Sequence, residues 1–337
     1  MYFDNLKLEK GMYNVAGKSF TEVLEELDCS KNYENTPYAN LDAYQRQLKR
    51  FDIKVSGTNS DAVEKFFKTT DSAALFPEYV ARAVKQGMEE ANILNEIVAT
   101  KTNISGLDYR TITSTPVEPD TSVDTEDGIA EGAEIPEVSI KTKDNLIKLK
   151  KRGRMLVSSY EAVRNQRLDL FTVTLKQIGA YIAKAQLADA ISVLMNGDGN
   201  DNAAAQTNKA GSDFAYTDLL ALWSALEPHE LNTMLVSPDA MLSMLSFEEF
   251  KNPLTGLNFA GTGKLSTPIG ATMFKSNSVP SGTIIGLDKK CALEMVTLDD
   301  IVIDYDKLIN RQLERTAVTS TAGFAKIFTD ASHILKI

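Results

Sequence analysis

Residues 168–196 place the tightest constraint on the fold, because they predict one long uninterrupted helix. The segment LDLFTVTLKQIGAYIAKAQLADAISVLMN contains no proline and is rich in alanine. An apolar stripe at helical spacing is expected at Leu175, Ile178, Ile182, Ala185 and Ala188, and Gly197 is expected to end the helix. At a rise of 1.5 Å per residue such a helix is roughly 40 Å long. A helix of this length predicts a structural spine rather than a small element that fills a core.

Composition disfavours several classes of protein that could contain such a helix. The chain has 337 residues, of which 46 are acidic and 36 basic, and its net charge of -10 disfavours a general nucleic-acid binder. Cys29 and Cys291 lie far apart without CxxC spacing, which predicts neither a disulfide framework nor a zinc site and fits a reducing compartment. The N-terminus lacks the apolar core of a signal peptide, and we expect no membrane span and no membrane partner.

Motifs for catalysis or cofactor binding are scarce. The two histidines, His229 and His333, provide too little material for a triad or a metal cluster and are expected to be locally satisfied. GTGKLST at 261–267 lacks both the leading glycine and the Ser or Thr of a phosphate loop, and NGDGNDN at 196–202 lacks the Gly and Glu of a calcium loop. We therefore predict no catalytic residue, no cofactor and no metal ligand.

Residues 1–75 read as short helices joined by polar links. SFTE at 19–22 has the Ser-x-x-Glu capping pattern, and apolar residues recur at helical spacing in the segment that contains Tyr44 and Leu48. Because the segment cannot bury much by itself, it is either a flexible tail or a strap that folds against neighbours, and its aromatic content favours the strap. A helix with Pro77 near its start follows over residues 76–88.

Opposite charges follow one another between residues 118 and 154. Residues 118–137 carry acidic but no basic side chains, whereas residues 141–154 carry many lysines and arginines and a single acid, Asp144. In KDNLIKLKK, apolar residues interleave with lysines, which predicts a strand in an extended hairpin arm. The two charged strips either meet another copy of the chain or pair within the hairpin, and the charge pattern favours neither alternative.

The remaining chain mixes helices and strands. Residues 217–228 predict an amphipathic helix, residues 232–238 a buried strand, and residues 238–250 a further helix. From residue 268 onward, short β-like segments alternate with turns. The predicted fold class is α+β.

The order of these segments resembles that of the major capsid proteins of tailed bacteriophages with the HK97-type fold. The resemblance spans about residues 72–337 and rests on EGAEIPE at 131–137, VSSYEA at 157–162, the long helix ending in NGDG, and the final VP and GTIIGLD at 279–288. It implies an N-terminal arm, an extended β-hairpin loop, a spine helix in a peripheral domain, and an axial domain. The expected ranges are an arm at 1–75, a connecting helical region at 76–102, the extended loop at 103–148, the peripheral domain at 149–211 with the spine at 168–196, the axial domain at 212–300, and return strands of the peripheral domain at 301–337.

The resemblance also implies a function and partners. It implies self-assembly into hexamers and pentamers of an icosahedral shell around double-stranded DNA, which is contacted non-specifically. Assembly in the host bacterial cytoplasm with a separate scaffolding protein, a portal and a decoration protein would place the subunit in the virion capsid. The expected inter-subunit contacts are Glu126, Asp127, Glu131, Glu134, Lys148, Lys150, Lys151, Arg152 and Arg154. The alternatives are an encapsulin-type shell that holds cargo enzymes and, more remotely, a hydrolase with a carboxylate pair.

Overall fold

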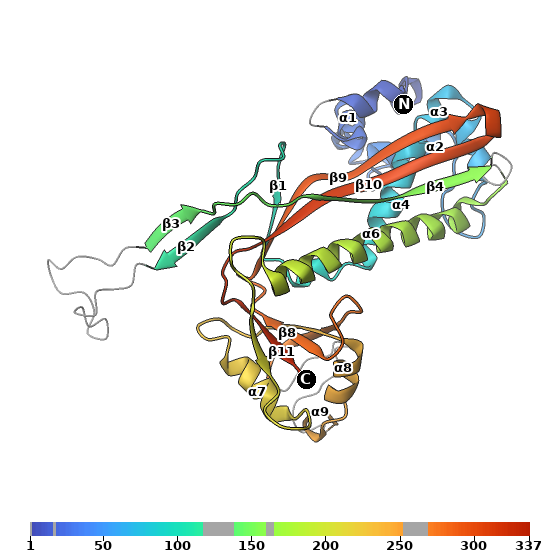
Figure 1. Ribbon diagram of the computed structural model, residues 1–337. Helices are drawn as coiled ribbons and strands as arrows, with labels where there is room; N and C mark the ends of the chain where they lie inside the picture. Colours follow the sequence, from blue (N-terminus) through green and yellow to red (C-terminus); the bar gives the residue numbers. More distant parts are fainter. Residues whose placement is uncertain (1, 16–17, 117–137, 160–164, 252–268) are drawn as a thin grey trace. The chain divides into compact units, whose positions relative to one another are not determined.

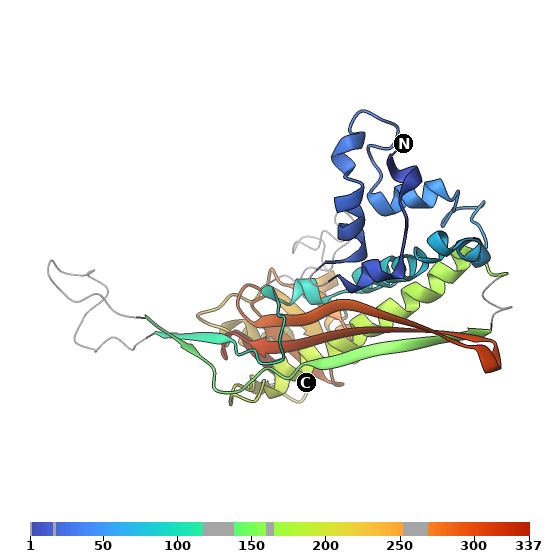
Figure 2. The ribbon, with the colours of Figure 1, turned by 90° about the horizontal axis from the view of Figure 1, so that it is seen from above.

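The computed structural model describes residues 2–15, 18–116, 138–159, 165–251 and 269–337 (Figures 1 and 2). The described chain divides into two compact units. Unit 1 comprises Met1–Ala91, Arg152–Ala183 and Ile301–Ser320, and unit 2 comprises Asn92–Lys151, Lys184–Asp300 and Thr321–Ile337. The motifs EGAEIPE at 131–137 and GTGKLST at 261–267 lie outside the described residues.

The N-terminal part of unit 1 is built from short helices with well-formed caps. The backbone N–H of Glu22 donates to the Ser19 hydroxyl (3.3 Å), and the Ser19 N–H donates to the Glu22 carboxylate (2.7 Å), which confirms the predicted capping box. Asp42 and Gln45 cap the next helix in the same reciprocal way. The helices are α1 (Phe20–Leu27), α2 (Ala43–Arg50), α3 (Thr70–Ala73), α4 (Phe76–Glu90) and the 3-10 turns η1 (Tyr2–Asn5), η2 (Lys10–Asn14), η3 (Ser30–Tyr33) and η4 (Val63–Phe67).

The aromatic and apolar residues of segment 1–75 are buried together with residues of α4 and α6. Leu24, Tyr44 and Phe66 are buried in one hydrophobic cluster with α4 and with Leu175 and other residues of the long helix. Even the Arg46 side chain is fully buried in this part of the molecule. The aromatic residues that suggested a strap thus pack against α4 and the long helix of the same chain.

The spine helix α6 (Leu168–Asn196) has the predicted bounds, and the Gly197 N–H donates to the Val193 carbonyl with Gly197 at φ +80°. Its buried face includes Leu175 and Ile182, as expected, but Ala188 lies on the exposed face. Length and composition would allow α6 to cross a membrane, contrary to our expectation that no segment would qualify. Half of the qualifying window is buried inside the protein, as in the core helix of a globular protein.

Two glycines allow α4 and α6 to cross at very short distance. A Cβ atom on Gly87 would lie 2.2 Å from the Lys176 carbonyl oxygen, and one on Gly179 would lie 2.1 Å from the Val84 carbonyl oxygen. Both glycines therefore face the backbone of the opposite helix. Only a residue without a side chain permits this approach.

A four-stranded sheet has the order β1-β9-β10-β4, so that β4 is an edge strand (Figures 1 and 2). β1 runs parallel to β9, with Thr100 opposite Glu294. The sequence suggested separate strands around residues 293 and 301, but β9 runs through both segments. The strands are β1 (Thr100–Asn103), β4 (Lys150–Ser159), β9 (Leu293–Leu308) and β10 (Leu313–Lys326), and the turns η5 (Leu94–Glu96) and η8 (Ile309–Arg311) lie beside them in sequence.

A five-stranded sheet in unit 2 has the order β5-β11-β8-β6-β7. The predicted buried strand β6 is buried at all four positions. β11 pairs antiparallel with β8, with His333 opposite Gly286, so this strand belongs to the five-stranded sheet. The elements are β5 (Ala205–Asn208), α7 (Tyr216–Ser224), β6 (Thr233–Val236), α8 (Pro238–Met244), α9 (Glu248–Lys251), β7 (Thr272–Lys275), β8 (Thr283–Leu287) and β11 (Ser332–Lys336).

The expected hairpin is present as β2 (Ile112–Pro116) and β3 (Val138–Thr142), which pair only with each other. The antiparallel register places Ile112 opposite Thr142 and Pro116 opposite Val138. Residues 143–149 are not a strand of this hairpin, contrary to the prediction from KDNLIKLKK. The Ile147 side chain is instead buried against Val296 of β9 and Ala325 of β10. Burial of this apolar side chain on the four-stranded sheet is favoured over extension of the hairpin.

Candidate inter-subunit surface

The basic residues expected at subunit contacts lie on or just before the edge strand β4 rather than in the hairpin ladder. Lys148, Lys151 and Arg154 are exposed, whereas Arg152 is half-buried. Because β3 of the hairpin ends at Thr142, these side chains cannot form the basic half of a charge ladder with β2. An edge strand leaves one row of backbone groups unpaired and is a ready place for another chain to bind.

One of the basic residues has a partner in its own chain. The Lys150 ammonium group lies 2.8 Å from an Asp189 carboxylate oxygen on α6. Lys148 and Lys151 form no ion pair among the residues that the structure describes. The Asp189 carboxylate is buried and the Lys150 side chain is half exposed, so this ion pair fixes Lys150 on α6.

The part of β4 that belongs to unit 1 carries Arg154 and exposed apolar side chains. The Arg154 guanidinium stacks over the Tyr181 ring at 3.8 Å from its centroid. Met155 and Val157 alternate with it and point to the opposite face of the strand, where they are 56% and 50% exposed. Exposed apolar side chains on an edge strand are typical of protein–protein contact surfaces. Charge alone drew attention to this strand, although the alternation of Met155 and Val157 was also readable from the sequence.

The acidic residues predicted to face this surface, Glu126, Asp127, Glu131 and Glu134, lie outside the described residues. Their contact with the basic side chains stays a prediction.

The first strand of the hairpin is tied at its root to a buried carboxylate. Glu294 on β9 is 6% exposed and accepts hydrogen bonds from the hydroxyls of Thr102 (2.6 Å), Tyr109 (2.9 Å) and Thr111 (2.6 Å). Burial, together with the neighbouring Glu294 charge, raises the pKa of Tyr109. Three hydroxyl donors satisfy the buried charge and fix residues 102–111 on the sheet.

The second strand is tied to the loop that ends the spine helix. Lys143 lies 3.5 Å from Asp198, with both side chains buried, and the Asn145 side chain donates to the Gly199 carbonyl (2.6 Å). Burial lowers the pKa of the adjacent Lys326 to about 8, and Lys143 donates to its carbonyl oxygen. The NGDG segment, which the sequence identified only as a helix stop, therefore anchors the hairpin.

Beyond this root the hairpin offers apolar side chains to solvent. Ile112 and Ile140 are 55% and 70% exposed, and both belong to the two-stranded ribbon drawn in Figure 1. A two-stranded ribbon with exposed isoleucines has no core of its own. It is suited to bind a surface that the single chain does not provide.

Known proteins share this architecture. The family model for phage capsid protein matches residues 142–331, whereas a comparison with curated proteins finds no match. The fold resembles a virus-like particle from Pyrococcus furiosus (12% identity, 77% of this chain and 98% of that chain, TM-score 0.52). It also resembles the capsid of the native GTA particle (15%, 72% and 89%, TM-score 0.53) and a structure of Microbacterium phage Oxtober96 (10%, 72% and 90%, TM-score 0.51).

The long helix, the hairpin and the two sheets thus define an HK97-type shell subunit. The matched segment includes β4, the whole of α6 and most of both sheets. The chain belongs to the phage capsid protein family. The resemblance inferred from the order of sequence segments is confirmed.

Proposed function

We propose that the protein forms the hexamers and pentamers of a tailed-phage head that encloses double-stranded DNA, and that it acts without enzymatic activity of its own. The observation that carries this proposal is the family match over residues 142–331. The head assembles in the host bacterial cytoplasm with a separate scaffolding protein, a portal and a decoration protein. DNA inside is contacted non-specifically, since a net charge of -10 does not favour tight binding to phosphates.

In this proposal, the hairpin lies across an adjacent subunit. Its firmly anchored root at Glu294 and Lys143 and its exposed Ile112 and Ile140 support such a role. The acidic residues Glu126, Asp127, Glu131 and Glu134 and the basic residues of β4 would contact neighbouring copies, and complementary charges would set the register of assembly.

Electron microscopy of purified protein tests the proposal. We expect closed shells, capsomer rings or tubes in negative stain, and nucleic acid rather than cargo enzyme in shells isolated from infected cells. A compact 37.0 kDa monomer that persists at high concentration, with and without scaffolding protein, would contradict it.

Reversal of two exposed charges tests the basic surface. Lys148→Glu combined with Lys151→Glu should leave the subunit soluble and folded, because both side chains are exposed. Like charges brought together at an interface cost several kcal/mol, so the yield of shells should fall by about tenfold or more. The measurement is the fraction of protein that sediments as shells at equal total concentration.

The matched control is Lys31→Glu combined with Lys101→Glu, which reverses two exposed lysines elsewhere and changes the net charge equally. This variant should assemble like the unaltered protein. Normal yield and salt resistance of shells from the Lys148 and Lys151 variant would show that these lysines make no contact between subunits.

A further inference from the structure

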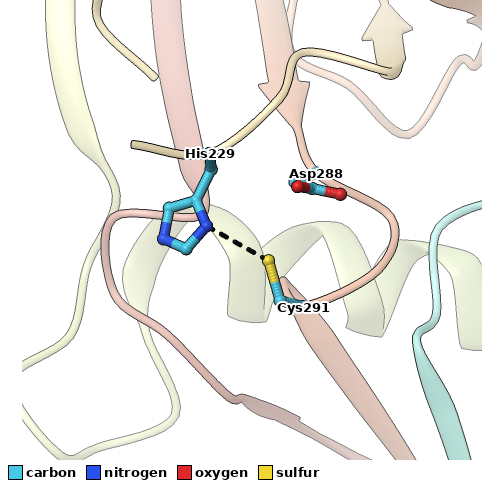
Figure 3. A group of neighbouring side chains, drawn as sticks. All are labelled: His229, Asp288 and Cys291. Carbon is cyan, nitrogen blue, oxygen red and sulfur yellow. Dashed lines mark hydrogen bonds between the residues drawn. The ribbon is translucent and has the colours of Figure 1, made fainter. Parts of the chain in front are cut away.

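Three connections of unit 2 meet at one end of the five-stranded sheet. His229 precedes β6, Asp288 and Cys291 lie in the turn after β8, and Asp330 lies between β10 and β11. Figure 3 shows His229 and Cys291 turned toward each other with Asp288 beside them, and the His229 Nδ1 to Cys291 Sγ distance is 3.3 Å. One ligand atom from each of these three residues lies within 4.8 Å of the other two. A nitrogen of His229, the sulfur of Cys291 and an oxygen of Asp288 thus lie close together at this end of the sheet.

The second ring nitrogen of His229 contacts a carboxylate and thereby orients the ring. His229 Nε2 lies 3.0 Å from an Asp330 carboxylate oxygen. When the carboxylate oxygen accepts the Nε2 hydrogen, Nδ1, which faces Cys291, is the ring nitrogen that can bind a metal. A histidine that binds a metal through one nitrogen usually donates the other N–H to a carboxylate in this way.

Asp288 is a buried carboxylate, 5% exposed, that is held rigidly. It accepts from the Asn232 side chain (2.6 Å) and from the backbone N–H groups of Lys290 (2.9 Å) and Glu230 (3.2 Å). The adjacent lysine side chains pair elsewhere, Lys289 with Glu96 and Lys290 with Glu230, each at 2.9 Å. Buried charges in proteins are usually paired or bound to a metal, and carboxylates that bind metals are themselves held by hydrogen bonds.

A nucleophilic triad is the competing interpretation. The Cys291 thiol contacts His229, which could act as its base, and His229 in turn contacts the carboxylate of Asp330, which could orient it. A nucleophilic cysteine is activated by a neighbouring positive charge. Here the buried Asp288 carboxylate lies beside the thiol, and the ammonium groups of Lys289 and Lys290 pair with Glu96 and Glu230 instead. This arrangement of donor atoms favours a bound cation over an activated nucleophile.

We propose that His229, Asp288 and Cys291 bind one divalent transition-metal ion of the zinc class, and that Asp330 orients the histidine. Zinc bonds of about 2.0–2.3 Å place tetrahedral ligands about 3.5 Å apart, close to the spacing of Nδ1 and Sγ. A mixed nitrogen, sulfur and oxygen set favours zinc over calcium or magnesium. His229 and Cys291 are half-buried, which leaves the ion a path from solvent, and water completes the coordination.

Binding would link the connection before β6 to the turn after β8, which are distant in sequence, and would stabilise unit 2, since the unfolded chain lacks the assembled site. This inference does not depend on the proposed interface, because the residues His229, Asp288, Cys291 and Asp330 all belong to unit 2 of a single chain.

Cobalt(II) titration of the full-length protein, stripped with a chelator under reducing conditions, tests the site. We expect one equivalent of cobalt per chain, intense visible bands of a tetrahedral site, a sulfur-to-cobalt charge-transfer band, and displacement by zinc. Cys291→Ser should abolish the charge-transfer band. Asp330→Asn should weaken zinc binding by about 10- to 100-fold, as expected for loss of a carboxylate that orients a ligand.

The matched control is Cys29→Ser, which removes the other cysteine, in unit 1, and should change neither band. Far-UV circular dichroism reports whether each variant is folded. If Cys291→Ser does not fold, the unaltered protein and Asp330→Asn, whose side chain is 62% exposed in the parent, still decide the result. Absence of a charge-transfer band in the folded unaltered protein, or its loss in Cys29→Ser, would overturn the proposal.

Discussion

Arg46→Met is expected to lower the free energy of unfolding of unit 1 by about 3–5 kcal/mol, because it removes one partner of a buried ion pair. The Arg46 side chain is 0% exposed and its Nε lies 2.7 Å from the Asp28 carboxylate, which is 1% exposed. The same guanidinium donates to the Asp28 and Leu41 carbonyl oxygens (2.6 Å each) and to the Ser30 hydroxyl (3.0 Å). Methionine fills the space but leaves a buried carboxylate with only the Tyr33 hydroxyl as its partner (2.6 Å).

Urea unfolding of the unassembled subunit, followed by circular dichroism, measures this loss. Lys49→Met is the control, since it makes a similar change at an exposed position of α2 and should cost less than about 1 kcal/mol. Arg46→Lys should also destabilise unit 1, because an ammonium group cannot reproduce the fork of hydrogen bonds. Equal stability of the Arg46→Met and Lys49→Met variants would show that the buried pair does not hold the N-terminal helices.

Gly179→Ala is the second large effect, and its sign opposes the usual rule. In a helix interior this exchange normally stabilises by about 1 kcal/mol. Here the new Cβ would lie 2.1 Å from the Val84 carbonyl oxygen and 2.8 Å from the Met88 nitrogen, so no rotamer change relieves the clash. We expect a net loss of about 3 kcal/mol or separation of α4 from α6, at the upper end of the usual cost of overpacking.

Thermal unfolding compared with Gly11→Ala checks this prediction. A Cβ on Gly11, also in unit 1, meets no atom within 4 Å, so the control should unfold like the parent. A melting temperature of Gly179→Ala equal to or above that of the parent would mean that α4 and α6 do not approach as closely as the structure shows.

Sequence patterns correctly predicted the elements that depend on interactions between residues close together in the chain. The bounds of α6 and its stop at Gly197 followed from the absence of proline and from a glycine that tolerates positive φ. The capping box at Ser19 and Glu22 and the buried strand β6 were predicted for similar reasons. The face that α6 buries was predicted less well near its C-terminal end, since Leu187 and Ala190 pack in the core of unit 2 and Ala188 lies on the exposed side.

Predictions failed where a distant partner outweighed a local tendency. Residues 143–149 read as a strand, yet Ile147 packs on Val296 and Ala325 and the hairpin ends earlier. The aromatic content of the N-terminal segment indicated a strap, but only the structure shows its partner, since Tyr44 and Phe66 pack in the core that includes Leu175 of α6. The last strand joined the five-stranded sheet because β8 offered it an antiparallel edge.

By itself, the sequence determined the spine helix, the order of segments that identifies the capsid fold, and the position of the basic residues before and on β4. Each depends on residues that are neighbours in the chain. Only the tertiary structure brought Cys291 beside His229, and Lys143 beside Asp198, because sheet pairing joins segments that are more than fifty residues apart. Long-range pairing leaves no periodic signal in the sequence, so the donor cluster and the anchored root of the hairpin became visible only in the folded chain.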